Sequence, residues 1–108
     1  MKILVTGAHG LLGRSLLQQH SDDVELLGCG RSADPVAERP YYQAQLLEPG
    51  AAAGLLAEVR PDWVIHTAAL TNVDLCETER AEARQINLDM VAQLAQASGH
   101  LGDHFVLP

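Results

Sequence analysis

The chain has 108 residues, 14 acidic against 7 basic side chains, and a formal net charge of −7. Nucleic-acid backbones reward clustered lysine and arginine, so an acidic chain whose one lysine is Lys2 is expected to bind no nucleic acid. No apolar run approaches membrane-spanning length, and the cysteines and histidines follow no disulfide or metal-ligand spacing. We therefore expect a protein of the cytoplasm without a metal site or a membrane span. We also expect no signal peptide, because a glycine turn interrupts the first apolar run.

The chain opens with an apolar strand that runs into a glycine-spaced turn and then into a helix. Residues 2–5 supply the strand, and Ile3, Leu4 and Val5 form a continuous apolar run, as in a parallel strand buried on both faces. Gly7 allows a tight turn, Gly10 lets a phosphate approach the main chain, and Gly13 lets the helix pack on the strand. The helix, with Leu12, Leu16 and Leu17 on its apolar face, offers an anion its first N–H groups and its dipole. We interpret this turn as a pyrophosphate cradle, the alternative being an ordinary strand–helix turn.

A second strand is predicted over residues 24–28, and the segment Cys29-Gly30-Arg31-Ser32 follows it. At this strand end of a dinucleotide fold, an acidic side chain selects NAD through the ribose 2′-hydroxyl, whereas an arginine accommodates the 2′-phosphate of NADP. Here no carboxylate is present, and Arg31 and Ser32 offer a guanidinium and a hydroxyl, both suited to a phosphate. The sequence therefore favours NADP(H) over NAD(H), the alternative being that Arg31 is a solvated loop residue.

The rest of the chain alternates strands and helices. A segment rich in small and polar residues follows the predicted strand at residues 63–65. Ligands bind at the carboxyl ends of the strands in open parallel sheets. The alternation predicts an α/β fold, a Rossmann-type parallel sheet of about four to five strands with flanking helices, incomplete as it stands. We predict three further strands, at residues 41–45, 63–65 and 105–107, and two further helices, at residues 49–59 and about 79–98.

Residues 60–74, with Cys76, Glu77 and Asn87, resemble the extended branch of the short-chain dehydrogenase/reductase superfamily, in particular dTDP-4-dehydrorhamnose reductase and related sugar-nucleotide reductases. The opening residues 1–7 match as well, and the G-x-x-G-x-x-G spacing is similar to that of this branch. The resemblance covers the whole chain and corresponds to roughly the first third of such an enzyme. It implies an NAD(P)-binding Rossmann domain over residues 1–108, without the catalytic and substrate-binding parts.

The resemblance also implies roles for single residues. In the family the glycine turn carries the pyrophosphate, Ala68 and Ala69 match the wall beside the nicotinamide, and an acidic residue and an apolar one contact adenine where Gln45 and Leu46 stand here. Cys29 replaces the acidic residue after the second strand, which supports NADP. The implied cofactor-binding residues are Gly7, His9, Gly10, Leu11, Leu12, Gly13, Arg31, Ser32, Gln45, Leu46, Ala68, Ala69 and Asn87. The implied substrate-side residues are Thr71, Asn72, Val73 and Asp74.

The family's catalytic Ser/Thr and Tyr-x-x-x-Lys motifs have no counterpart in this chain, whose tyrosines are Tyr41 and Tyr42. No catalytic residue is therefore assigned, and three hypotheses stay open. The favoured one is the NADP(H)-binding part of a sugar-nucleotide reductase, whose partner would be a nucleotide sugar once the chain is completed. The second is a non-catalytic nucleotide-binding module similar to the regulatory β-subunit of methionine adenosyltransferase, and the third is an inactive truncated product. An open sheet edge would favour association into a homo-oligomer.

Overall fold

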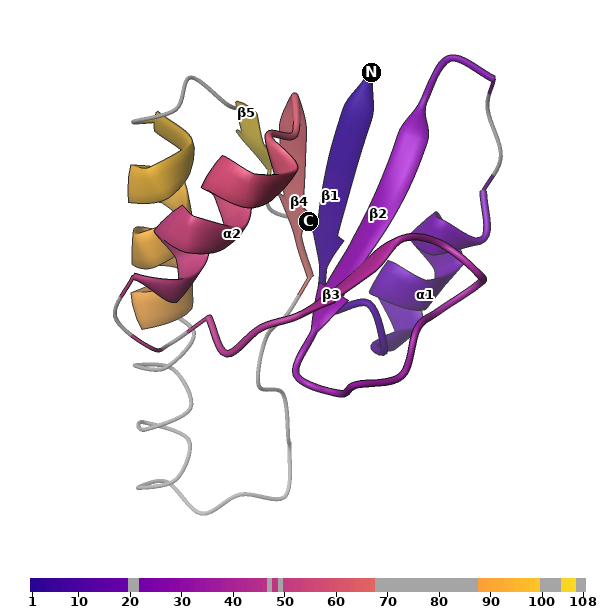
Figure 1. The fold of residues 1–108 in the computed structure, drawn as a ribbon, viewed down its shortest axis with the longest axis horizontal. Coiled ribbons are helices and arrows are strands. Elements are labelled where there is room, and N and C mark those ends of the chain that lie inside the picture. Colours follow the sequence, from indigo (N-terminus) through magenta and orange to yellow (C-terminus); the bar gives the residue numbers. More distant parts are fainter. Residues whose placement is uncertain (20–21, 47, 49, 68–87, 100–103, 107–108) are drawn as a thin grey trace.

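The computed structural model describes residues 1–19, 22–46, 48, 50–67, 88–99 and 104–106. These residues form a five-stranded sheet with helices on both faces (Figure 1). The strands lie in the order β3-β2-β1-β4-β5, and each neighbouring pair is parallel. The predicted parallel α/β fold is confirmed.

The elements match the predicted ones closely. Strand bounds differ from the predicted bounds by at most two residues, and α2 begins two residues later than expected, whereas the long C-terminal helix is described only over residues 88–99. The elements are β1 (Lys2–Thr6), α1 (Leu11–Leu17), β2 (Glu25–Gly30), β3 (Tyr41–Gln43), α2 (Ala51–Val59), β4 (Trp63–His66) and β5 (His104–Val106).

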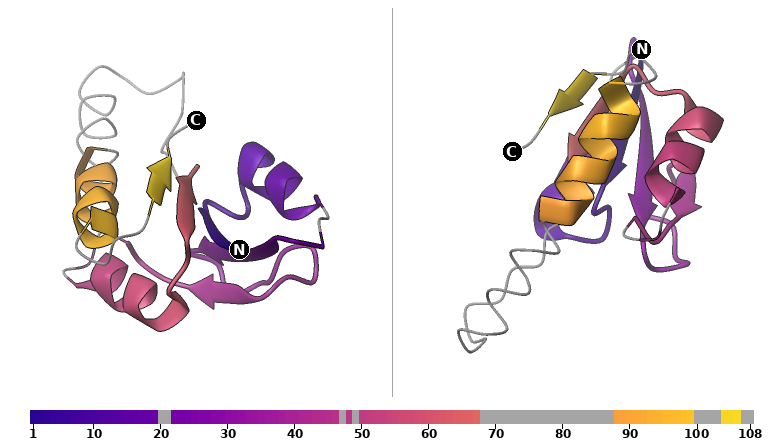
Figure 2. Two further views of the ribbon diagram at one scale, coloured as in Figure 1. Left: turned by 90° about the horizontal axis from the view of Figure 1, so that it is seen from above. Right: turned by 90° about the vertical axis from the view of Figure 1, so that its left-hand side faces the viewer.

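The central strand β1 is buried on both faces, as its continuous apolar run predicts. Successive side chains of a strand point to opposite faces, and Leu4 and Val5, both fully buried, accordingly belong to different core clusters. Leu4 lies in the cluster beneath α2 and residues 88–99, and Val5 lies in the cluster beneath α1. Figure 2 shows these helices on the two sides of the sheet. The sheet is thus covered on both faces.

Of the three leucines predicted on the apolar face of α1, Leu17 is buried and Leu16 packs against the core, whereas Leu12 does not. We expected Leu12 in its apolar face, but the structure leaves Leu12 46% exposed and buries Gly13 and Leu17. The cause is the close approach of the helix to the turn before it. A Cβ on Gly13 would overlap the carbonyl oxygen of Gly7, so Gly13 faces the turn. Leu17, one turn later, then enters the core, and Leu12 is rotated away from it.

Positively charged side chains cover the carboxyl ends of both N-terminal helices. The guanidinium of Arg39 donates to the carbonyl oxygens of Leu17, through Nε at 3.0 Å, and of Gln19, through Nη2. The Lys2 ammonium donates to the carbonyl oxygen of Val59, the last residue of α2, at 3.1 Å. These carbonyls have no partner within their helices, and the cations also complement the negative end of each helix dipole. Side chains that are distant in sequence therefore bind carbonyl groups at the ends of both helices.

A buried side-chain pair joins β1 to β4 at their carboxyl ends. Thr6 Oγ1 lies 2.7 Å from His66 Nδ1, and Thr6 and His66 are 0% and 4% exposed. Burial lowers the pKa of His66 below its ordinary value, because a charged imidazole would lose its hydration there. The imidazole is therefore held in its neutral form.

Adding one methyl group should change the free energy of unfolding in opposite directions at two glycines. Gly13→Ala should lower the free energy of unfolding by about 1–3 kcal/mol, because the Cβ meets backbone that cannot yield freely. The matched control is Gly54→Ala, within α2, where a Cβ meets nothing within 4 Å. This variant should raise the free energy of unfolding by about 0.5–1 kcal/mol, since alanine favours helix. Urea unfolding followed by circular dichroism measures both, and equal stability of Gly13→Ala and wild type would contradict the close contact.

Acid should weaken the fold through His66. Because the folded pKa of His66 is lowered, the unfolded chain binds this proton more readily, and the free energy of unfolding falls as the pH drops below about 6.5. His66→Asn removes the titrating group. Denaturant unfolding of both proteins between pH 7 and pH 5 should show a steeper loss of stability in the wild type. Parallel curves for the two proteins would show that His66 does not carry this acid sensitivity.

Candidate functional site

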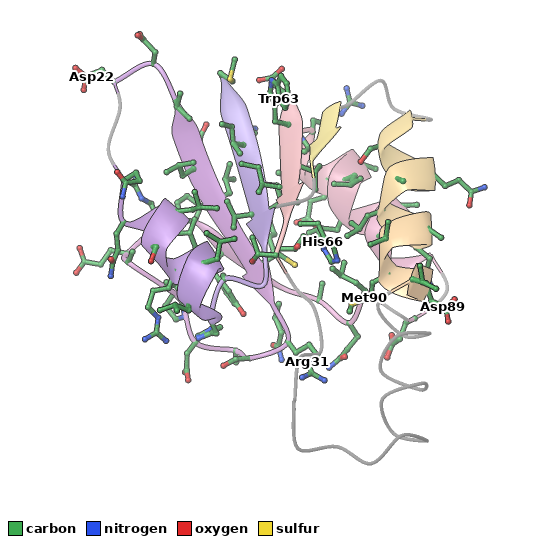
Figure 3. The ribbon with its side chains drawn as sticks, turned by 180° about the vertical axis from the view of Figure 1, so that it is seen from behind. Asp22, Arg31, Trp63, His66, Asp89 and Met90 are labelled. Atoms are coloured by element: carbon green, nitrogen blue, oxygen red, sulfur yellow. The ribbon has the colours of Figure 1, made fainter. Side chains whose placement is uncertain are left out.

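The candidate site lies at the carboxyl ends of β1, β2 and β4. From β1 the chain proceeds outwards through β2 and β3 and then crosses to β4 on the other side of β1. In open α/β sheets ligands bind outside the carboxyl ends of the strands, at such a switch in strand order. Figure 3 shows Arg31 at this end of the sheet and Trp63, the first residue of β4, at the opposite end.

The glycine turn presents main-chain groups at this edge. Gly7 has φ 69°, in the left-handed region that favours glycine, and its carbonyl oxygen accepts the Gly10 N–H at 2.9 Å. No side chain caps α1, so the N–H groups of Leu11, Leu12 and Gly13 in its first turn have no acceptor within the helix. The side chain of Leu11 is 90% exposed and does not cover them. Uncapped amides at a helix N-terminus suit an anion, as the sequence predicts.

A residue that the sequence analysis did not single out fixes the turn from β4. Thr67 Oγ1 donates to the carbonyl oxygen of Thr6 at 2.5 Å and lies 3.3 Å from that of Gly7. The Thr67 N–H donates in turn to Thr6 Oγ1 at 3.2 Å. The only signal in the sequence was its position directly after the strand. Thr67 therefore holds the start of the glycine turn against the neighbouring strand.

The loop after β2 carries the two residues predicted to select the cofactor. The Arg31 side chain is exposed and makes no hydrogen bond or ion pair within the described ranges. Ser32 Oγ accepts the Asp34 N–H at 3.1 Å, which leaves the hydroxyl proton of Ser32 free to be donated. Cys29, at the position of the family's acidic residue, is 1% exposed, and burial raises the pKa of its thiol to about 12. It belongs to the core beneath α2 and offers the loop no negative charge.

The structure separates the two residues predicted to contact adenine. Gln45 is exposed, whereas Leu46 is 7% exposed and packs into the core beneath α2. His9, in the glycine turn, reaches the loop after β2, where its Nε2 lies 2.6 Å from the carbonyl oxygen of Asp34. The predicted residues Ala68, Ala69, Thr71, Asn72, Val73, Asp74 and Asn87 lie outside the described residues.

The described residues contain neither a membrane-spanning helix nor a cluster of metal ligands. No helix there is both long and apolar enough to cross a membrane. In the same part of the chain, no group of three or more His, Cys, Asp or Glu side chains is arranged to hold a metal ion.

Comparison with known proteins gives the same family as the sequence resemblance. The dTDP-4-dehydrorhamnose reductase of Burkholderia thailandensis is 36% identical over 106 residues, which cover 98% of this chain and 32% of that protein. Methionine adenosyltransferase 2 subunit beta of Danio rerio is 33% identical over 100 residues, 91% of this chain and 30% of that protein. The solved structure of a dTDP-4-dehydrorhamnose reductase from Clostridium acetobutylicum is 31% identical with a TM-score of 0.78, covering 97% of this chain and 34% of that one.

The chain thus spans about a third of the length of these relatives. All of its residues, 1–108, match the family described as RmlD substrate binding domain. This match and the similar reductases show that the protein belongs to that family.

Proposed function

We propose that residues 1–108 form the dinucleotide-binding domain of a reductase that acts on a nucleotide sugar, with NADP(H) preferred over NAD(H). The observation that carries this proposal is the uncapped N-terminus of α1 above the Gly7 turn, with Arg31 two residues beyond Cys29, which stands where an NAD-selecting fold has a carboxylate. The similarity to dTDP-4-dehydrorhamnose reductases supports a dTDP-linked keto sugar as the substrate class. Cytoplasmic location and association into a homo-oligomer stay predictions.

The residues at the site fit such a cofactor. The amides of Leu11, Leu12 and Gly13 would receive the pyrophosphate, because the bare Gly10 leaves the main chain accessible. Arg31 and Ser32 would hold the ribose 2′-phosphate, and Gln45 would face adenine. The remaining roles follow from the resemblance alone: Ala68 and Ala69 beside the nicotinamide, Asn87 in contact with the cofactor, and Thr71, Asn72, Val73 and Asp74 on the substrate side. When bound, the reduced cofactor supplies the hydride that reduces a carbonyl carbon.

A second function is favoured by a specific observation. The similarity to methionine adenosyltransferase 2 subunit beta is comparable with the similarity to the reductases. The alternative is a nucleotide-binding module without catalysis. NADPH oxidation by the full-length protein in the presence of dTDP-4-dehydrorhamnose separates the two, because only the reductase turns over. Binding without turnover would favour the module, and no binding would favour an inactive product.

Replacement of Arg31 should abolish much of the preference for NADPH. Arg31→Ala removes one charge-assisted contact to the 2′-phosphate. The loss of binding free energy should be about 1.5–3 kcal/mol, which makes NADPH binding roughly ten- to a hundredfold weaker. NADH affinity should change less than about twofold. Arg60→Ala is a matched control, since it removes the same charge at the end of α2, where the chain enters β4. Calorimetric titration with both cofactors measures the ratio, and an unchanged ratio in Arg31→Ala would remove Arg31 from the site.

Filling the glycine turn should prevent dinucleotide binding. A Cβ at Gly10 would lie 3.3 Å from the carbonyl oxygen of Gly7, so the fold can accept it with a small shift, while the branched side chain of Gly10→Val occupies the space of the phosphate. Gly54→Val adds the same side chain in open space on α2 and serves as control. With folding checked by circular dichroism, only Gly10→Val should lose NADPH binding. Unchanged affinity in a folded Gly10→Val would return the turn to an ordinary strand–helix connection.

A further inference from the structure

Side chains from two other parts of the fold hold the loop of residues 31–34, which we call the ribose loop. The carbonyl oxygen of Arg31 accepts from Gln43 Nε2 at 3.0 Å, and that of Ser32 accepts from the Tyr41 hydroxyl at 2.6 Å. The carbonyl oxygen of Asp34 lies 2.6 Å from His9 Nε2, which carries the proton because a carbonyl can only accept. Three carbonyls of the loop are thus bound by β3 and by the glycine turn.

These contacts also set the direction of the loop's N–H groups. In a planar trans peptide the carbonyl of one residue and the N–H of the next point in opposite directions, and the described residues contain no cis peptide. The N–H groups of Ser32 and Ala33 therefore point away from the Gln43 amide and the Tyr41 hydroxyl. Neither has a hydrogen-bond acceptor in the part of the chain that the structure describes. Together with the exposed Arg31 guanidinium, these two N–H groups are donors that the ribose loop offers to a ligand.

The Tyr41 hydroxyl is placed by its surroundings. A Cβ on Gly30 would lie 2.7 Å from the Tyr41 oxygen, so the bare main chain at Gly30 provides the space that this hydroxyl occupies. The Tyr41 ring meets His9 edge to face, with centroids 5.6 Å apart and an interplanar angle of 82°. Burial raises the pKa of Tyr41, so the hydroxyl keeps the proton that it donates. Tyr41 is thus the centre of the contacts around the ribose loop.

We propose that Tyr41, with Gln43 and His9, is a positioning residue for the 2′-phosphate of NADP(H): these side chains hold the carbonyl oxygens of Arg31, Ser32 and Asp34 and so turn the N–H groups of Ser32 and Ala33 towards the phosphate. This inference rests on the proposed function and extends the choice of cofactor beyond Arg31 and Ser32. A carbonyl released from these contacts could turn towards the phosphate and repel it, whereas a ribose with a free 2′-hydroxyl would tolerate either direction.

The test compares two ligands that differ only in the 2′-phosphate, adenosine 2′,5′-bisphosphate and 5′-AMP. Tyr41→Phe removes the hydroxyl and keeps the ring against His9. The matched control is Tyr42→Phe, the same change at the next residue of β3, whose side chain packs against the core beneath α2. Calorimetric titration of the full-length protein should show roughly two- to tenfold weaker bisphosphate binding in Tyr41→Phe, the range expected for one neutral hydrogen bond. Its 5′-AMP affinity, and both affinities of Tyr42→Phe, should stay unchanged.

A second variant, Gln43→Ala, tests the same contacts through an exposed side chain and should weaken bisphosphate binding in the same selective way. If the wild type prefers the bisphosphate and both variants keep that preference, the positioning role is wrong while the proposed NADP(H) site stands. Equal losses of affinity for the bisphosphate and for 5′-AMP would likewise show that Tyr41 has only a structural role. A wild type without any preference for the bisphosphate would overturn the NADP(H) assignment together with the positioning role.

Discussion

Helix α1 lies so close to the Gly7 carbonyl that the main chain must be bare at Gly13, and the arrangement of the site depends on this contact. Because Gly13 faces the turn, Leu17 enters the core one helical turn later and the first N–H groups of α1 come to lie at the end of β1. The Thr67 hydroxyl then binds the carbonyls around the turn from the side of β4. The shape of the anion site is therefore set by backbone packing and one hydroxyl, and the side chains of its own turn contribute little.

The net charge of −7 does not oppose an anion site of this kind. Net charge acts over the whole surface and is screened by salt, whereas amides and a guanidinium act at contact distance. At the carboxyl edge of the sheet the structure gathers the uncapped start of α1, the outward N–H groups of the ribose loop and Arg31. Asp34 lies in the same loop with its N–H and its carbonyl bound within the protein, and its exposed carboxylate is a negative charge close to these donors. Local groups, rather than the net charge, therefore determine what this edge can bind.

The sequence predicted the fold well because its strands are apolar runs that glycine and proline interrupt. It predicted Leu16 and Leu17 on the inner face of α1 correctly and Leu12 wrongly, since helical periodicity takes no account of a backbone contact such as the one at Gly13. It also placed Leu46 in the site, whereas a buried leucine at that point extends the core beneath α2. The contacts of Thr67 with Thr6 and of His9 with Asp34 join residues 61 and 25 positions apart. Such pairs depend on strand register and loop course, which local patterns do not encode.

Both candidate functions need a bound dinucleotide, but only the reductase also needs a proton donor. The proposed binding of a dinucleotide would use the glycine turn, the amides of α1 and the ribose loop, which lie within the described residues, and Ala68, Ala69 and Asn87, which do not. Reduction needs in addition an acid that delivers a proton to the carbonyl oxygen, and the family's tyrosine and lysine have no counterpart among these 108 residues. Since similar proteins include both reductases and a methionine adenosyltransferase subunit, the relatives do not separate the two functions. Cofactor binding is the property that both functions would have in common, and the source of the proton is the property that separates them.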